Sequence, residues 1–161
     1  MLSTETKQAI QKLQGSYPEK RSALIPALHL AQNEVGYLPH DVQQEVADLF
    51  DLDTTEVQAI VTFYDMFFDE PVGKHIIHVC KNASCMLRGC DKILKGLCSR
   101  LKDDKDFHVI ASECLAACDK APMMIVNDKV IGPVEESDLD KIIEDARKSQ
   151  GHPSPVTLGD I

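Results

Sequence analysis

Two closely spaced pairs of cysteines constrain this sequence more than any other feature. Four residues separate Cys80 from Cys85, and three separate Cys114 from Cys118. The first pair falls in a loop between a predicted strand and a predicted helix, and the second falls in a loop between two predicted strands. Loops at the same end of a sheet can face each other, so the four thiolates would converge on one point. Such convergence is what a site with four cysteine ligands requires.

The spacing of these cysteines favours an iron–sulfur cluster, most simply a [2Fe–2S] centre. None of the six cysteines forms the Cys-x-x-Cys motif that zinc knuckles and dithiol oxidoreductases typically use. Small residues in the two loops would let backbone N–H groups approach the sulfurs: Ala83, Ser84, Ala116 and Ala117. A structural zinc held by the same four cysteines stays open as the alternative. Cys90 and Cys98 fall in a predicted helix, where we expect core or exposed thiols.

Charge and motif content exclude several classes of function. The net charge is −9, with 4 basic and 12 acidic residues in residues 1–70 and 13 of each in residues 71–150. Proteins that bind nucleic acids or anionic membranes need clustered basic residues, so neither partner is expected. The eight glycines form neither Gly-x-Gly-x-x-Gly nor a Walker loop, so an NADH or flavin site is expected in another chain. We predict no catalytic residue in this chain.

The sequence shows no signal for membrane insertion or export. No apolar run approaches the ~18 residues that a spanning helix requires. Residues 1–13 lack the apolar stretch of a secretory signal and the arginine-rich composition of an organelle leader. We therefore expect a cytoplasmic chain whose cysteines are reduced.

Residues 1–70 carry four amphipathic patterns that predict a bundle of helices. Their expected limits are a first helix ending at Gly15, a second over residues 20–35, a third after Pro39, and a fourth opened by a capping box of Asp53 and Glu56. Pro26 must lie in the first turn of the second helix or kink it, and Gly36 is its expected C-cap.

Beyond a boundary at residues 71–73, the pattern alternates between strands and helices. Strands are predicted at residues 75–80, 107–111, 123–126 and 129–131, and helices at 91–101 and after a capping box of Ser137 and Asp140. This order predicts an α/β or α+β layer domain, and a thioredoxin-like arrangement fits it. We thus predict an N-terminal helical bundle over residues 1–70, a thioredoxin-like [2Fe–2S] domain over 71–150 and an extended tail over 151–161.

Five short motifs occur together in this chain. They are IPALH at residues 25–29, GYLP at 36–39, VTFY at 61–64, CMLRG at 85–89 and ECLAAC at 113–118. Over residues 5–148 the chain resembles the NuoE-type [2Fe–2S] subunit of respiratory complex I, NADH:quinone oxidoreductase. In two respects it departs from that family: Ala116 stands where a glycine is usual, and only 28 residues separate Cys85 from Cys114.

The resemblance implies an electron-transfer subunit of an NADH dehydrogenase. It implies that Cys80, Cys85, Cys114 and Cys118 hold the [2Fe–2S] cluster, and that the chain docks on a flavoprotein subunit that oxidises NADH with FMN. Further iron–sulfur subunits would belong to the same complex, on the cytoplasmic face of a membrane. Similar subunits serve NAD-reducing and electron-bifurcating hydrogenases and NAD-dependent formate dehydrogenases, and the sequence does not separate these settings. A zinc-stabilised interaction module is the alternative from a different class of protein.

Overall fold

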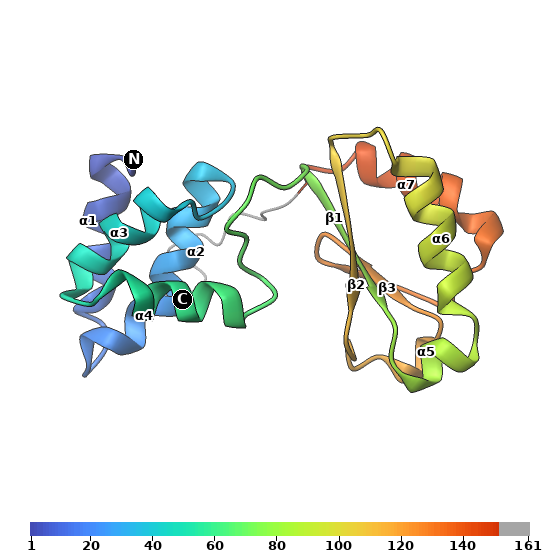
Figure 1. The fold of residues 1–161 in the computed structure, drawn as a ribbon, viewed down its shortest axis with the longest axis horizontal. Coiled ribbons are helices and arrows are strands. Elements are labelled where there is room, and N and C mark those ends of the chain that lie inside the picture. The colour runs from blue at the N-terminus through green and yellow to red at the C-terminus, as the bar shows by residue number, and fades with distance from the viewer. Residues whose placement is uncertain (152–161) are drawn as a thin grey trace. The chain divides into compact units, whose positions relative to one another are not determined.

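The computed structural model describes residues 1–151 of the 161-residue chain. These residues fall into two compact units, one covering Met1–Pro71 and one beginning at Val72 (Figure 1). The tail predicted for residues 151–161 lies, apart from Gly151, outside the described residues. Within the described part, no helix combines the length and the apolar character needed to cross a membrane.

The first unit, described over Met1–Pro71, is built from helices. They are α1 (Thr4–Gln14), α2 (Leu24–Val35), α3 (His40–Phe50) and α4 (Thr54–Phe63), with a short 3-10 turn at Lys20–Ala23 before α2. Pro26 lies in the first turn of α2, and Gly36 ends that helix with φ +91°, both as predicted. Asp53 caps α4 by accepting the Thr55 N–H. The predicted capping box is wrong in its second half, because the Glu56 carboxylate instead pairs with Arg21 at 2.9 Å.

A buried glutamine joins α2 to the segment that follows α4. Gln32 is only 2% exposed and lies in the apolar core of the first unit. Its amide nitrogen donates to the Met66 carbonyl at 2.9 Å, and its amide oxygen accepts the Phe68 N–H at 2.9 Å. Between these two anchors Phe67 is buried, with its ring 4.9 Å from that of His29. Both hydrogen-bonding groups of the buried amide are therefore satisfied by the backbone of one loop.

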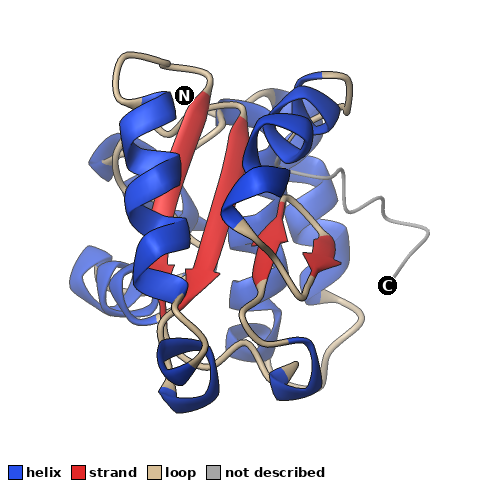
Figure 2. Cartoon of the chain, turned by 90° about the vertical axis from the view of Figure 1, so that its right-hand side faces the viewer, coloured by secondary structure: helices blue, strands red, loops and turns tan. Residues whose placement is uncertain are grey.

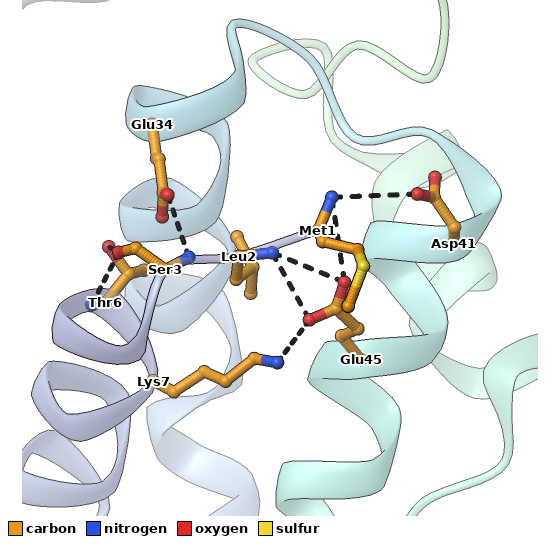
Figure 3. A network of polar contacts seen from close by, with 8 residues as sticks. All are labelled: Met1, Leu2, Ser3, Thr6, Lys7, Glu34, Asp41 and Glu45. Atoms are coloured by element: carbon orange, nitrogen blue, oxygen red, sulfur yellow. Dashed lines mark hydrogen bonds and ion pairs between the residues drawn. The ribbon is translucent and has the colours of Figure 1, made fainter.

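Carboxylates of α2 and α3 hold the segment that precedes α1 (Figure 3). The Leu2 N–H donates to both oxygens of Glu45, at 3.2 and 3.3 Å, and the Ser3 N–H donates to Glu34 at 2.8 Å. The Lys7 ammonium lies 2.5 Å from the Glu45 carboxylate. Burial would raise the pKa of Glu45, but the hydrogen bonds from Lys7 and Leu2 outweigh it and lower the pKa.

The described part of the second unit contains a four-stranded mixed sheet in the order β2-β1-β3-β4. The strands are β1 (His75–Cys80), β2 (Phe107–Ser112), β3 (Met124–Val126) and β4 (Lys129–Ile131). β1 and β2 are parallel, β3 is antiparallel to β1, and β4 is antiparallel to β3. Figure 2 shows the strands in red, with β1 and β2 running side by side.

Two helices, α6 (Cys90–Leu101) and α7 (Leu139–Arg147), cover one face of this sheet (Figure 1). Alternation along β1 turns Ile77 and Val79 toward them, where they join Leu97 and Leu139 in one apolar core. The amphipathic patterns of the sequence therefore mark the buried faces. Helices followed by a mixed sheet with helices packed on it confirm the predicted fold class.

Three elements of the second unit differ from the sequence-based expectation. The short helix α5 (Ala83–Leu87) and a 3-10 turn at Cys118–Lys120 lie in segments predicted as loops. The capping box predicted for the last helix is also wrong. Glu135 and Asp138 form it instead, ahead of a 3-10 turn at Glu136–Asp138 that leads directly into α7.

The edge of the sheet at which β1 and β2 begin is closed by side chains, and we call it the closed edge. Phe107 is buried there, with the His75 ring at 4.9 Å and the Arg147 guanidinium 4.9 Å above its centre. Arg147 also pairs with Asp104. Asn127, in the turn between β3 and β4, brings its amide nitrogen to 3.4 Å from His75 Nδ1. This edge is held together by contacts within the chain.

Candidate metal centre

The opposite edge of the sheet, where β1 and β2 end, leads into both cysteine loops, and we call it the cysteine edge. β1 ends at Cys80, which lies opposite Ser112, the last residue of β2. The Lys81 N–H still donates to the Ser112 carbonyl at 2.9 Å, so the pairing continues one residue beyond β1. Cys114 follows Ser112 by two residues. Parallel pairing therefore starts both loops at the same edge, as the sequence predicted.

The first cysteine pair is buried. Cys80 is 3% exposed and Cys85 is 2% exposed, and both pack with Cys90, Ala121 and Met123. Cys85 lies in α5, which starts immediately beyond the end of β1 (Figure 1). The two thiols are hydrogen-bonded to each other. A strand end and a short helix thus bring the first two predicted ligands together.

Backbone N–H groups from both loops reach the sulfur of Cys80. Burial raises the pKa of this thiol, but hydrogen bonds from the backbone of Leu115 and Asn82 outweigh it and leave the pKa lowered. For Cys85, burial dominates and raises the pKa despite a backbone hydrogen bond from Met123. Donated N–H groups stabilise negative charge on sulfur, which is why the pKa of Cys80 is lowered although the thiol is buried.

The second cysteine pair lies at the surface. Cys114 and Cys118 are both exposed. Cys114 follows β2 without regular structure, and Cys118 begins the 3-10 turn that precedes β3. Between them Ala116 adopts φ +60°, in the left-handed region that favours glycine. Leu115 connects this loop to the first one, because its N–H is the group that reaches the Cys80 sulfur.

The structure therefore brings the two loops together without closing four sulfurs into one shell. Within residues 1–151, no group of three or more histidine, cysteine, aspartate or glutamate side chains is arranged to hold a metal ion. Cys80 and Cys85 lie together, and Cys114 and Cys118 lie at the surface of the neighbouring loop.

The two cysteines that we did not predict as ligands behave differently from each other. Cys90 is the first residue of α6 and is 1% exposed. Burial, followed by the charges of Asp91 and Cys80, raises the pKa of its thiol. Cys98 lies further along α6 and is exposed. These are the core thiol and the exposed thiol that the helical pattern suggests.

One polar contact at the cysteine edge was not predicted from the sequence. The Asn82 side-chain nitrogen donates to the Glu113 carboxylate at 3.1 Å, and so links one cysteine loop to the other. An asparagine three residues before Cys85 is a recognisable N-cap signal, but nothing local points from it to a residue 31 positions away.

The residues at the cysteine edge fit an iron–sulfur cluster. Soft thiolate ligands are the donors that such clusters use, and four thiols arise from two loops that leave the sheet side by side. Backbone N–H groups already hydrogen-bond Cys80 and Cys85. Both the donor set and its surroundings suit a cluster of this kind.

Comparison with known proteins agrees with this geometry. A family model described as thioredoxin-like [2Fe–2S] ferredoxin matches residues 10–147. The chain is a member of this family. Its cofactor is accordingly a [2Fe–2S] cluster, and the thioredoxin-like fold and the resemblance inferred from the sequence motifs are both confirmed.

Several similar proteins belong to multisubunit oxidoreductases. An NADH-quinone oxidoreductase subunit of Rhizobium meliloti is 36% identical over 151 residues, covering 89% of this chain and 90% of that protein. An NADH-quinone oxidoreductase subunit of Aquifex aeolicus is 35% identical, covering 86% and 91%. The NADP-reducing hydrogenase subunit HndA of Solidesulfovibrio fructosivorans is 36% identical, covering 80% and 79%.

Among solved structures, an NAD+-reducing [NiFe]-hydrogenase in the H2-reduced state has a similar fold. The TM-score is 0.66 at 23% identity, and the match covers 78% of this chain and 22% of the hydrogenase chain. At this identity the likeness supports the fold alone, and the chain corresponds to about a fifth of the hydrogenase chain it matches.

Proposed function

We propose that this chain is the [2Fe–2S] electron-transfer subunit of an NADH dehydrogenase complex, with Cys80, Cys85, Cys114 and Cys118 as the cluster ligands. The observation that carries the ligand assignment is the hydrogen bonding at Cys80. Its sulfur receives backbone N–H groups from Asn82 of its own loop and from Leu115, which lies between the other two cysteines. The similarity to NADH-quinone oxidoreductase subunits of two bacteria supports the setting.

When bound, the cluster supplies the ability to take up and release one electron at a time. The chain's own residues determine where it is held and what surrounds it. Cys80 and Cys85 would hold the buried side, where their low exposure excludes water. Cys114 and Cys118 would hold the outer side, which leaves a short route to a partner protein. Backbone N–H groups would stabilise the thiolate charge on the buried side.

The partner in this proposal is a flavoprotein subunit that binds FMN and oxidises NADH. NADH gives up two electrons as a hydride, whereas a [2Fe–2S] cluster carries one, so a flavin has to stand between them. The sequence contains no Gly-x-Gly-x-x-Gly and no Walker loop, which supports a nucleotide site in that other chain. Further iron–sulfur subunits complete the complex, which lies on the cytoplasmic face of the membrane.

A second candidate setting is a hydrogenase that uses a nicotinamide nucleotide. The 36% identity to the NADP-reducing hydrogenase subunit HndA, over 80% of this chain, favours it. The cluster and its ligands would be the same in both settings, and only the final electron acceptor or donor would differ.

The cluster assignment is tested by purifying the full chain under anaerobic conditions and measuring iron, sulfide, visible absorption and the EPR spectrum after dithionite reduction. We expect two irons and two sulfides per chain with one S = 1/2 signal. Cys114→Ala should lose the cluster, whereas the matched control Cys98→Ala, at another exposed cysteine, should keep it. A colourless chain with one tightly bound zinc would overturn the proposal.

The setting is tested by isolating the complex from cells that express the tagged full chain. Purified material should oxidise NADH with an artificial acceptor and should contain FMN. Hydrogen-dependent reduction of a nicotinamide nucleotide by the same material would identify the hydrogenase setting instead.

A further inference from the structure

Asn82 occupies a position from which it acts on both cysteine loops. It lies between Cys80 and Cys85 in the sequence, and its side-chain oxygen accepts the Ala83 N–H at 2.9 Å as the N-cap of α5. Its backbone N–H is one of the two groups that reach the Cys80 sulfur. Because the side-chain oxygen is used by the cap, the amide nitrogen is directed to its other partner, Glu113.

Glu113 is held beside the first loop, although it belongs to the second. It immediately follows the last residue of β2 and immediately precedes Cys114. The bond from Asn82, at 3.1 Å, fixes its carboxylate toward the Cys80 loop. Asn82 is neutral, so this contact positions the negative charge without cancelling it.

The charge of Glu113 acts on the cysteine edge. Glu113 immediately precedes the proposed ligand Cys114, and its hydrogen bond to Asn82 holds its carboxylate beside the loop between Cys80 and Cys85. Lys81 lies in the loop between Cys80 and Cys85, and its ammonium is 4.0 Å from the Asp91 carboxylate, which offsets part of its positive charge. A carboxylate held beside both cysteine loops opposes the negative charge that an added electron brings to the site.

We propose that Glu113, positioned by Asn82, lowers the reduction potential of the cluster. This inference rests on the proposed function, since it requires the cluster at these cysteines. Glu113 acts through its charge, and Asn82 acts as a positioning residue that keeps that charge close. Net charge and hydrogen bonds near the sulfurs are among the features that set the potential of such clusters.

The test is a potentiometric titration of the purified, cluster-loaded full chain, monitored by EPR. Glu113→Gln removes the charge and keeps an oxygen that accepts the Asn82 amide. Its midpoint potential should shift to a more positive value, with iron and sulfide content unchanged. Asp145→Asn is the matched control, because it makes the same change of charge on α7, among residues near the turn between β3 and β4. It should leave the midpoint potential where it is.

A second variant separates the effect of where the Glu113 carboxylate is held from the effect of its charge. Asn82→Ser keeps a residue that can cap α5 but removes the amide that holds Glu113. In the Asn82→Ser background, adding Glu113→Gln should shift the midpoint potential by less than it does in the wild type. The difference between wild type and Glu113→Gln should also narrow as salt is raised, because mobile ions screen an exposed charge.

The outcomes distinguish this inference from the function on which it rests. Equal midpoint potentials for the loaded wild type and the loaded Glu113→Gln variant would overturn the inference and leave the proposed function intact. Failure of Glu113→Gln to retain iron, with Asn82→Ser titrating like the wild type, would also overturn it, because Glu113 would then be needed to hold the loop. A wild-type chain that binds no cluster would instead overturn the proposed function.

Discussion

The two edges of the four-stranded sheet are built in opposite ways. At the closed edge, Phe107 is covered by the rings and charges of its neighbours, and each contact is made within the chain. At the cysteine edge, two thiols are buried and two lie at the surface of the adjoining loop. We therefore expect the closed edge to supply stability and the cysteine edge to supply the proposed ligands. This division implies that each edge can be altered without disabling the other.

The largest effect is loss of cluster binding at the cysteine edge, without a loss of stability. Cys118→Ala should abolish cluster binding, because a [2Fe–2S] cluster needs all four ligands. The free energy of unfolding of the cluster-free protein should change by no more than about 0.5 kcal/mol, since the side chain is exposed. Iron analysis and urea unfolding of the cluster-free chains measure the two quantities. A large loss of stability in this variant would contradict the division between the edges.

The next largest effect is a loss of stability at the closed edge. Phe107 is 7% exposed, and Phe107→Ala should lower the free energy of unfolding of the second unit by about 3–5 kcal/mol through loss of buried area and creation of a cavity. The EPR spectrum of the protein that remains folded should be unchanged. The matched control is Phe63→Ala, because Phe63 is 76% exposed and its loss should change stability by about 0.5 kcal/mol or less.

A smaller effect tests the backbone of the exposed loop. Ala116→Gly should stabilise the cluster-free chain by about 1 kcal/mol, because its φ of +60° strains alanine and not glycine. Ala117→Gly is the control. The φ of Ala117 is −121°, so glycine relieves no strain there and should destabilise by roughly 0.5–1 kcal/mol. Thermal unfolding measures the stability of both variants. Equal changes in unfolding temperature in the same direction would argue against strain at Ala116.

The smallest effect is a pH dependence of stability that arises at the closed edge. Burial, then the charge of Lys74, lowers the pKa of His75 at the closed edge. The Asn127 oxygen accepts the Ile76 N–H at 3.0 Å, so its nitrogen faces His75 Nδ1, which must accept and stay unprotonated. The unfolded chain then binds the extra proton more readily than the folded one. Stability from this residue is complete above a pH of about 6.5 and is lost as the pH falls below that value.

The measurement is the pH dependence of urea unfolding. Between about pH 7.5 and 5, the wild type should lose stability more steeply than His75→Gln, by at most about 1.4 kcal/mol per pH unit. His29 also has a pKa lowered by burial, but it is present in both proteins and cancels in the difference. If the free energies of unfolding of the two proteins fall in parallel with pH, His75 does not contribute to the pH dependence of stability.

Local signals in the sequence were sufficient for most of the elements. Gly36 and Asp53 mark helix ends through their own conformations and hydrogen bonds, which neighbouring residues determine. The capping box ahead of the last helix was misplaced because Glu135 with Asp138 and Ser137 with Asp140 have the same spacing, and only packing decides between them. The five-residue helix α5 is too short to show a helical period.

The fold and the cofactor of the candidate site were predictable from the sequence, whereas the ligand set stays a prediction and the details of the site were not predictable. The cysteine spacing and the accompanying motifs led to the family that the comparison confirmed. Which thiols are buried depends on Ala121 and Met123, which come from the segment leading into β3. The contact between Asn82 and Glu113 spans 31 residues and exists only because β1 and β2 are parallel neighbours. Tertiary contacts of this kind leave no local signal in the sequence.

The hydrogen bonds of the buried Gln32 amide limit which residues can replace this glutamine. Its oxygen accepts from Phe68 while its nitrogen donates to Met66, and both partners belong to the backbone. Glutamate has the same shape but cannot donate in its ionised form, and leucine or methionine can do neither. No second mutation in the loop can restore the match, because changing a side chain leaves the backbone groups in place. Glutamine should therefore persist here even where the surrounding core has exchanged one apolar residue for another.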